Sequence, residues 1–446
     1  MNSNSQSSSP PPIPNPSYSR WAPKRKKQKF PPELIEDIYH RNSRYWILNG
    51  SGIYVHVGER AVSTEIRKRM LTAGFSASRE DVREVMLSVD LDNPVDYTLP
   101  FLPGFPTGFH IINGSRVLVP EALTLIKSVK GKTKLINDIL LSLLGSDQLM
   151  FFKGWLQIGY NALKNYESMP AQVLILSGPQ HCGKNLTQEQ IITPVLGGRI
   201  AEPYRYAVGR THFNEDLFKA AHLVISDQKQ PADRNDMREF IRRVASNGFD
   251  SWHGKNKEAI TLPTTWRMSV SCNEEEADLK IIPSLEGLED KLLLLRCALC
   301  PMPMPTGTPE ERKKFAAALA KEVPAFIYEL LNFEIPRALY HERFGIKGYL
   351  EPDLLRMVQQ LDPEQELLEL VQAAKQGSPQ LVLVDITANE LHVNIFAQTN
   401  LRNQLMTVAR SPIRLGQLLG KPAYRNDGIV TRSKFVTGYQ YYTIIV

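Results

Sequence analysis

The sequence is poor in cysteine and contains no long apolar run. Its four cysteines are Cys182, Cys272, Cys297 and Cys300. Four thiols in 446 residues do not make a disulfide framework, which favours a reducing compartment. Apolar runs such as residues 292–295 have the length of a strand, whereas about 20 apolar residues are needed to cross a bilayer. The N-terminus also lacks the apolar core of a secretion signal. We therefore expect no membrane association and a location in the cytoplasm, or in the nucleus of a eukaryotic host.

Most of the sequence also lacks an excess of charge of either sign. Lys and Arg number 53 and Asp and Glu 47, which gives a net charge of +6. All of this surplus falls in residues 1–30, which are rich in Ser and Pro, carry six basic residues and have no acidic one. We predict that residues 1–30 form a disordered basic arm. This arm could bind nucleic acid, act as a nuclear localisation signal or increase the solubility of the protein. The net charge by itself is thus weak evidence for a nucleic-acid partner.

The remaining sequence changes character several times, which indicates more than one domain. Residues 31–120 contain short β-rich stretches, Asn-Gly turns and one helical stretch near 78–86, which is typical of a small α+β domain. Residues 121–166 carry apolar residues at three- and four-residue spacing and are predicted to form a helical collar. Residues 167–308 have an α/β pattern, and residues 309–378 are helical.

The last region, residues 379–446, has the outline of a winged helix. Thr387 and Glu390 fit a capping box at the start of a helix. A helical pattern continues through Leu419, and a basic two-stranded ribbon follows it. Helices followed by such a ribbon predict a winged-helix domain.

A phosphate-binding loop is the clearest chemical motif. The apolar run 173–176, typical of a buried parallel strand, leads into GPQHCGKN. In this GxxxxGK pattern the glycines let backbone N–H groups surround phosphate oxygens, and Lys184 reaches the β- and γ-phosphates. Asn185 stands where Ser or Thr usually binds Mg²⁺, and its amide oxygen can serve the same purpose. The predicted nucleotide-binding residues are Gly178, Pro179, Gln180, His181, Cys182, Gly183, Lys184, Asn185 and Leu186.

Two later apolar strands also end in polar residues. Residues 221–226 lead to Asp227 and Gln228, and residues 266–271 lead to Asn273. An Asp that closes a strand near a P-loop is the expected second protein ligand of Mg²⁺. Gln228 occupies the position of the glutamate that activates water in most such ATPases. It can orient water but cannot take its proton, so hydrolysis is expected to be slow unless another carboxylate substitutes. Asn273 is expected to sense the γ-phosphate and to help hold the attacking water.

The succession GPQHCGKN, LVISDQ, a basic hairpin and SVSCN within residues 178–273 resembles the superfamily-3 helicases, which are AAA+ ATPases of small viruses, phages and mobile elements. It is most similar to the helicase part of phage and poxvirus-type primase-helicases, over roughly residues 120–300. The resemblance implies an α/β fold with an AAA+ P-loop ATPase core, a parallel sheet flanked by helices. It also implies that subunits form a ring, usually a hexamer, which binds ATP and Mg²⁺ between subunits and moves along single-stranded DNA.

The resemblance further implies two sets of site residues. A β-hairpin before the sensor strand enters the central channel of the ring, and His253, Lys255 and Lys257 of the matching stretch are the expected DNA contacts. An arginine supplied by the neighbouring subunit neutralises charge on the transferred phosphate. We expect Arg296 in this role, and the alternatives are Lys291, Arg242 and Arg243.

The sequence therefore predicts an ATP-dependent replicative DNA helicase of a phage, virus or mobile genetic element. Lys184, Asp227, Gln228, Asn273 and Arg296 are its expected catalytic residues, with Asn185 and Asp227 as ligands of Mg²⁺. A separate primase or replication initiator is an expected partner. Gln228 keeps open an initiator or loader that closes on DNA without processive unwinding. A third alternative is that residues 31–120 retain a primase.

Overall fold

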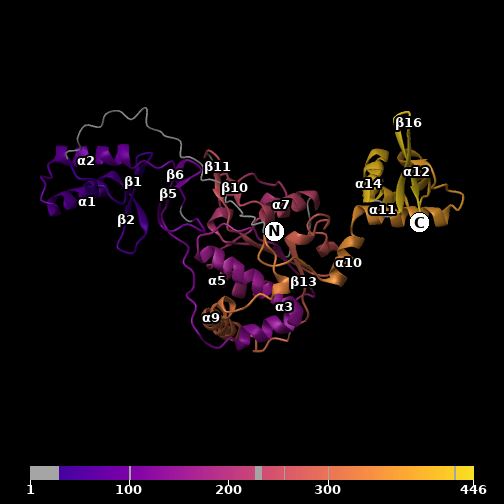
Figure 1. Ribbon diagram of the computed structural model, residues 1–446, viewed down its shortest axis with the longest axis horizontal. Coiled ribbons are helices and arrows are strands. Elements are labelled where there is room, and N and C mark those ends of the chain that lie inside the picture. The colour runs from indigo at the N-terminus through magenta and orange to yellow at the C-terminus, as the bar shows by residue number, and fades with distance from the viewer. Residues whose placement is uncertain are drawn as a thin grey trace, which may run out of the picture. The chain divides into compact units, whose positions relative to one another are not determined.

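The computed structural model describes residues 30–99, 102–226, 234–255, 257–299, 301–425 and 428–445 (Figure 1). Asp227 and Gln228 lie outside these residues, as does the basic arm apart from Phe30. The chain divides into two compact units, the first ending at Tyr97 and the second beginning at Thr98. This division comes before the boundary at residue 120 that the sequence suggests, and the other domain limits stay predictions.

The first unit is a small sheet with two helices packed on one face. Its elements are η1 (Pro32–Leu34), β1 (Ile38–Arg41), β2 (Arg44–Leu48), β3 (Tyr54–Val57), α1 (Glu59–Thr72) and α2 (Arg79–Asp92). The strands are antiparallel in the order β1-β2-β3. Because strand side chains alternate between faces, Ile38, Tyr45 and Ile47 point to the helices, where they meet Val62 and Val82 in the core. The helix expected near residues 78–86 is α2.

The collar region differs from its prediction. Residues 121–133 contain no helix, and the helix α3 begins only at Lys134 (Lys134–Lys164). The extended part is held by tertiary contacts instead: the Tyr160 hydroxyl donates to the carbonyl of Ile126, and the Val129 amide donates to the carbonyl of Pro324. Tertiary hydrogen bonds have here overridden a helical spacing of apolar residues, which is a weak local preference.

Helix α3 is long and apolar enough to cross a membrane by length and composition. It bends at Gly145, where φ is 69° and ψ is 172°. Many of its apolar side chains, among them Phe152, Trp155 and Leu156, are buried in the main core beside α9 (Pro309–Leu331). Packing in the core of the second unit thus accounts for its apolar composition.

The second unit is built on a six-stranded sheet of β14 (Tyr349–Leu350), β13 (Leu292–Arg296), β7 (Val173–Ser177), β12 (Arg267–Cys272), β9 (His222–Ser226) and β8 (Ile200–Ala201), in that order. All neighbouring pairs are parallel. Helix α7 (Arg234–Ser246) lies on one side of the sheet, and α3 and α9 lie on the other (Figure 1). This α/β arrangement, a parallel sheet flanked by helices, is compatible with a P-loop core. The strand before the predicted phosphate loop, β7, is fully buried between β13 and β12.

Shorter elements complete the second unit around this sheet. They are β4 (Tyr97–Thr98) at its boundary, β5 (Gly108–Ile112), β6 (Ser115–Val119), α4 (Lys184–Leu186), η2 (Thr187–Ile192), α5 (Thr193–Val195), α6 (Tyr204–Ala207), η3 (Leu217–Lys219), β10 (Phe249–Trp252), β11 (Ile260–Pro263), α8 (Glu276–Leu279), η4 (Glu289–Lys291), η5 (Arg337–Leu339) and α10 (Pro352–Gln360). The turn between β5 and β6 is Asn113-Gly114 with positive φ at both residues, which confirms the hairpin that the Asn-Gly pair indicates.

The C-terminal part has its own apolar core. Its elements are α11 (Pro363–Gly377), β15 (Ile386–Thr387), α12 (Ala388–Ala397), α13 (Arg402–Val408), α14 (Pro412–Arg425), β16 (Val430–Val436) and β17 (Tyr439–Ile444). The capping box is confirmed: Thr387 accepts from the Glu390 amide, and the Glu390 carboxylate accepts from the Thr387 amide. Within residues 379–446, the helices α12, α13 and α14 and the antiparallel β16–β17 ribbon are present as expected, and their assignment as a winged helix stays a prediction.

Candidate functional site

The backbone of the loop after β7 depends on two of its glycines. Gly178 has no room for a side chain, because a Cβ there would overlap the backbone and Cβ of Cys297. Gly183 has φ +110°, a left-handed value that favours glycine. Residues 184–195 then form one continuous helix made of α4, η2 and α5, with helical dihedral angles at both junctions. The strand and the helix that the motif needs on either side of the loop are therefore both present.

The structure brings together Lys184 of the phosphate loop and Asn273 at the end of β12. Lys184 is buried, and its Nζ lies 2.8 Å from the carbonyl oxygen of Gly178, 2.7 Å from that of Pro179 and 3.1 Å from Oδ1 of Asn273. Asn273 follows β12, which pairs with β7 in the sheet. The amide of Asn273 therefore lies beside the P-loop strand.

Asn273 extends this contact to a carboxylate that the sequence analysis did not single out. Its Nδ2 donates to Oδ2 of Asp278 at 2.7 Å. Asp278 lies in the short helix α8, five residues beyond Asn273, where no motif marks it. Lys184, Asn273 and Asp278 thus form a hydrogen-bonded row of cation, amide and carboxylate.

This row faces a cavity of about 560 Å³, a volume typical of small-molecule sites. The loop residues Gln180, His181, Cys182, Gly183, Lys184, Asn185 and Leu186 line it, together with Gln190, Ser271, Cys272, Asn273, Asp278, Met302, Thr306, Arg312 and Phe315. Arg312 is a second cation on this wall, anchored by hydrogen bonds to the carbonyls of Thr306 and Gly307. The sequence did not identify Arg312 as a site residue, because it lies in a helix far from any recognised motif.

The described residues fit a nucleotide, and they fit Mg²⁺ in part. Oδ1 of Asn185 accepts a hydrogen bond of 2.9 Å from Ser271, so the amide oxygen is held at the cavity. Asp227, the other expected ligand, is outside the described residues. Among the described residues no group of three or more His, Cys, Asp or Glu side chains could hold a metal. Nucleotide-bound Mg²⁺ does not need such a group, because it uses one or two protein oxygens with phosphates and water.

The electrostatics of the loop favour negative charge. The neighbouring Cys297 thiol and the Lys184 ammonium lower the pKa of Cys182 to about 6, against the opposing effect of burial. Burial raises the pKa of Cys272 to about 12 and that of Cys297 well above its ordinary value. The Lys184 ammonium, which contributes to the lowered pKa of Cys182, would also attract a phosphate anion.

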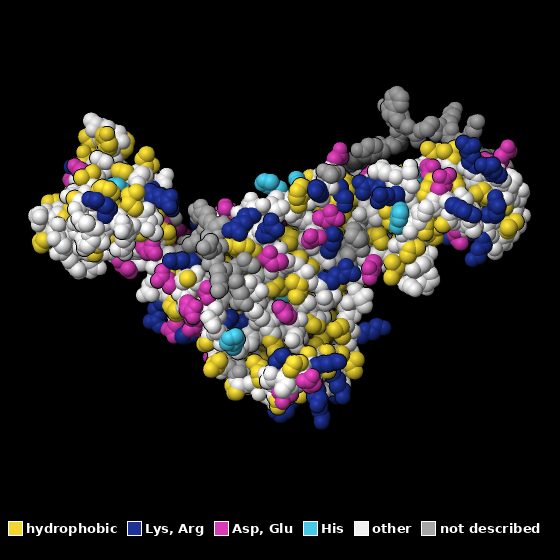
Figure 2. All heavy atoms as spheres, turned by 180° about the vertical axis from the view of Figure 1, so that it is seen from behind, with side chains coloured by type: hydrophobic (Ala, Val, Ile, Leu, Met, Phe, Trp, Pro, Cys, Tyr) yellow, Lys and Arg dark blue, Asp and Glu magenta, His cyan; other side chains and the backbone are white. Residues whose placement is uncertain are grey.

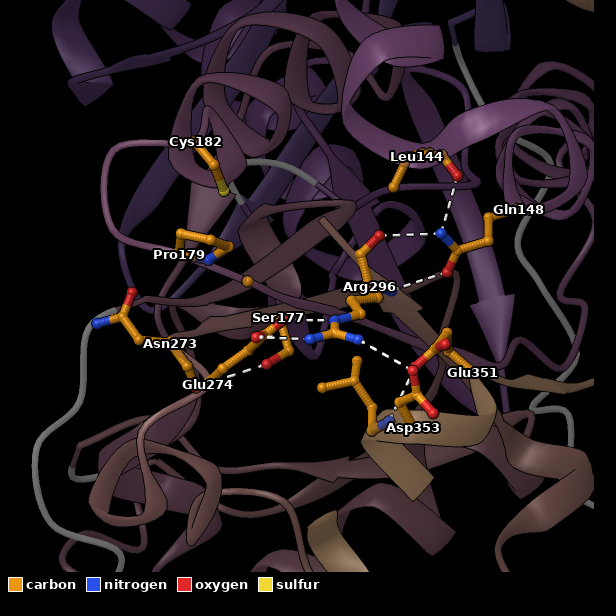
Figure 3. Close-up of polar contacts among 12 residues, drawn as sticks. Leu144, Gln148, Ser177, Pro179, Cys182, Asn273, Glu274, Arg296, Glu351 and Asp353 are labelled. Atoms are coloured by element: carbon orange, nitrogen blue, oxygen red, sulfur yellow. Dashed lines mark hydrogen bonds and ion pairs between the residues drawn. The ribbon is translucent and has the colours of Figure 1, made fainter. Parts of the chain in front are cut away.

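Arg296 is bound within its own chain (Figure 3). It ends β13, and its guanidinium pairs with Glu274 at 2.8 and 3.1 Å and with Asp353 at 3.2 Å. The Glu274 carboxylate raises the pKa of Arg296. The side chain is 40% exposed, so it remains accessible from one side. Gln148 of α3 fixes the strand end by bonding both the amide and the carbonyl of Arg296.

The three alternatives to Arg296 line one second cavity of about 890 Å³ beside α7 and η4. Each is paired with an acidic side chain: Arg242 with Glu239, Arg243 with Asp250, and Lys291 with Asp290. Arg243 also lies over the rings of Tyr206 and Phe240. The structure therefore gathers these three cations on one surface, separate from the phosphate loop.

The hairpin expected before the sensor strand is present as β10 and β11, which pair in antiparallel register. His253 and Lys255 are exposed in its turn. Lys257 lies 4.9 Å from the centre of the Trp252 ring and 3.3 Å from the Glu215 carboxylate. Basic and acidic side chains are interspersed over the face shown in Figure 2.

No family model matches this chain, and no curated protein matches it. Among solved structures, it is similar to the A form apo structure of the NrS-1 C-terminal region, with a TM-score of 0.52, 12% identity, and coverage of 92% of this chain and 96% of that one. A second apo structure of that region, residues 305–718, gives the same values. A structure described as SCCmec type IV Cch, active helicase, has a TM-score of only 0.27 at 10% identity, covering 84% of this chain and 67% of that one. The chain thus shares the fold of the NrS-1 region over most of its length.

Proposed function

We propose that this protein is an ATP-dependent DNA helicase of the superfamily-3 type, serving replication in a phage, virus or mobile genetic element. One observation carries the proposal: Lys184 of the phosphate loop and Asn273 of the adjacent strand meet at a cavity of nucleotide size. Both stand at the carboxyl edge of a parallel sheet, where α/β proteins bind their ligands.

In this proposal the loop amides and Lys184 bind the phosphates of ATP. The Lys184 ammonium now contacts the carbonyls of Gly178 and Pro179, and phosphate oxygens would replace these neutral acceptors with charged ones. Asn185 and Asp227 would hold Mg²⁺, which neutralises charge on the phosphates when bound. Asn273 would orient the attacking water.

We assign the missing carboxylate of this site to Asp278. Gln228 cannot accept a proton, whereas Asp278 is a cavity-lining carboxylate held against Asn273 at 2.7 Å. Its second oxygen would orient the water and take its proton as the water oxygen bonds to the γ-phosphorus and the bond from that phosphorus to the bridging oxygen breaks, releasing ADP and phosphate. ATP hydrolysis would then be faster than in a P-loop site that lacks a general base, despite Gln228.

The remaining parts of the proposal concern assembly. Subunits would form a ring, most simply a hexamer, in the cytoplasm of the host. Lys255, Lys257 and His253 would contact single-stranded DNA in the channel, and a separate primase or initiator would supply the start site. Arg296 would leave Glu274 and Asp353 to reach the nucleotide of the neighbouring subunit.

Two variants test the proposed helicase activity. Lys184→Ala should abolish ATP binding and unwinding together. Lys255→Ala combined with Lys257→Ala should keep ATP binding and abolish movement along single-stranded DNA. The matched control is Lys313→Ala combined with Lys314→Ala, since these lysines are exposed on α9. Normal unwinding by the hairpin variant would refute the channel assignment.

A second candidate is an initiator or loader that uses ATP to close on DNA without processive unwinding. Two observations favour it: Gln228 replaces the usual glutamate, and Arg296 is bound by two carboxylates of its own chain. Steady-state ATP turnover with and without single-stranded DNA separates the candidates. Strong recovery in Gln228→Glu would indicate a helicase with weakened hydrolysis, and absent turnover in both proteins would favour the loader.

A further inference from the structure

The first unit has a sheet face that its helices do not cover. The helices α1 and α2 pack on the side of Ile38, Tyr45 and Ile47. Alternation along the strands therefore sends Tyr39, Arg41, Arg44, Trp46, Leu48, Tyr54 and His56 to the opposite side. No residue of β1, β2 or β3 is acidic.

Three rings on this face lie in one row across the strands. The sheet register places Tyr39 opposite Trp46, and Trp46 opposite His56. The Trp46 and His56 ring centres are 5.5 Å apart. Trp46 is partly exposed and His56 is exposed. The planes of the Trp46 and His56 rings are inclined by 61° to each other, so each ring offers its own apolar face, at a spacing close to that of neighbouring strands, about 4.8 Å.

One end of the row is anchored. Tyr39 contacts the ring of Tyr54 at 5.5 Å, and the Tyr54 hydroxyl donates to Asp37 at 2.8 Å. The anchored pair keeps Tyr39 in place without using the exposed surfaces of Trp46 or His56. The row is thus a fixed platform, and ordering it costs little when a ligand binds.

Positive charge lies at the turn between β1 and β2. Arg41 and Arg44 are opposite each other in the register, and both belong to the face of the aromatic row. Arg44 is exposed. A row of aromatic rings with guanidinium groups at its edge suits a ligand that alternates flat rings with negative charges.

We propose that this face binds single-stranded DNA, with bases stacked on Tyr39, Trp46 and His56 and phosphates paired with Arg41 and Arg44. Bases of a duplex are stacked on each other and cannot offer their flat surfaces, so the platform selects single strands. The choice of DNA over RNA rests on the proposed function of the chain. The six basic residues of 1–30 precede this unit directly in the sequence and add to its charge.

The test uses the full chain without nucleotide and measures the binding of a short oligothymidylate by fluorescence anisotropy. Trp46→Ala combined with His56→Ala should weaken binding about tenfold or more, since each stacked base contributes substantially to affinity. Leu87→Ala combined with Leu91→Ala is the matched control, because these side chains are 56% and 69% exposed on α2. The control should bind as the wild type does.

Two further measurements keep the inference falsifiable if the aromatic variant is unstable. Arg41→Gln combined with Arg44→Gln should reduce the slope of log affinity against log salt by about one to two, whereas Arg83→Gln on α2 should not. Trp155, Trp252 and Trp266 are buried, so in a Trp21→Phe background quenching by oligothymidylate should be reduced by Trp46→Phe. Unchanged affinity, salt slope and quenching in these variants would overturn the inference.

The outcomes of these experiments distinguish a failure of this inference from a failure of the proposed helicase activity. The aromatic variant should keep its ATP turnover measured without DNA, and Lys184→Ala should keep its binding to the platform. Suppose that ATP turnover and unwinding are absent from the wild type but the aromatic variant still loses DNA affinity. This result would support the DNA-binding face and refute the proposed helicase activity. Tenfold tighter binding of oligouridylate would overturn the choice of DNA. A change in oligomer mass without a change in DNA affinity would assign the face to a second copy of the chain.

Discussion

Cys182 offers a direct chemical test of the phosphate loop. This thiol lines the cavity, lies 3.7 Å from the Lys184 Nζ and has its pKa lowered to about 6. The lowered value means that the thiolate predominates above pH 6 and is lost as pH falls through 6. Because the thiolate is the species that alkylating reagents attack, the rate of alkylation should follow this titration.

The size of the effect can be worked out. At pH 7 a thiol with a pKa of about 6 is about 90% thiolate, whereas one with the ordinary value of 9.0 is about 1%. A less basic thiolate is a weaker nucleophile, and a Brønsted slope of about 0.45 removes about twentyfold over this difference. The net gain is about fourfold, and burial of the thiol reduces it further. The diagnostic quantity is therefore the midpoint of the pH profile, near 6, and not the absolute rate.

Iodoacetamide labelling followed by peptide mass spectrometry measures this midpoint, in a Cys300→Ser background. Cys272 and Cys297 serve as internal controls, since their raised pKa values keep them protonated at neutral pH. ATP should slow the labelling of Cys182, because both occupy the same cavity. A midpoint at pH 8 or above, or equal labelling with and without ATP, would refute the electrostatic description of the loop.

Three further predictions concern other sites. Asp278→Asn should lower ATP turnover about 10²-fold or more, with nucleotide affinity changed less than threefold, in steady-state and equilibrium assays; equal turnover would exclude it as the base. Arg296→Ala should lower turnover about 10³-fold while ATP binding persists, and doping it into wild-type rings should inhibit more than in proportion; a loss of thermal stability alone would make it a structural residue. Thr387→Ala should lower the unfolding free energy of the C-terminal part by about 1 kcal/mol in urea titrations, since it removes a helix cap, and Thr431→Ala on the ribbon is the control.

The phosphate loop and its sheet could be predicted because their signals are local. An apolar strand, a glycine pattern and a following helix are contiguous in sequence, and the carboxyl ends of parallel strands meet at one edge. That geometry made the meeting of Lys184 and Asn273 predictable across 89 residues. The collar was wrong in residues 121–133, because hydrogen bonds to α3 and α9 outweigh the apolar spacing there.

Asp278 and the partners of Arg296 could not be predicted, for a common reason. Each carboxylate reaches its partner from a loop or a short helix whose path depends on packing, as Glu274 and Asp353 do from opposite sides of the Arg296 side chain (Figure 3).

An arginine that is to act on a neighbouring subunit must be kept soluble and oriented until assembly. Carboxylates of its own chain can do both, provided that the nucleotide phosphates compete for it more strongly. Once a ring brings the nucleotide within reach, the γ-phosphate would offer the guanidinium charged oxygens in place of those of Glu274 and Asp353. Removing one carboxylate, as in Glu274→Gln, should therefore ease the exchange and raise ATP turnover at low protein concentration. Unchanged turnover would show that Arg296 never leaves its partners.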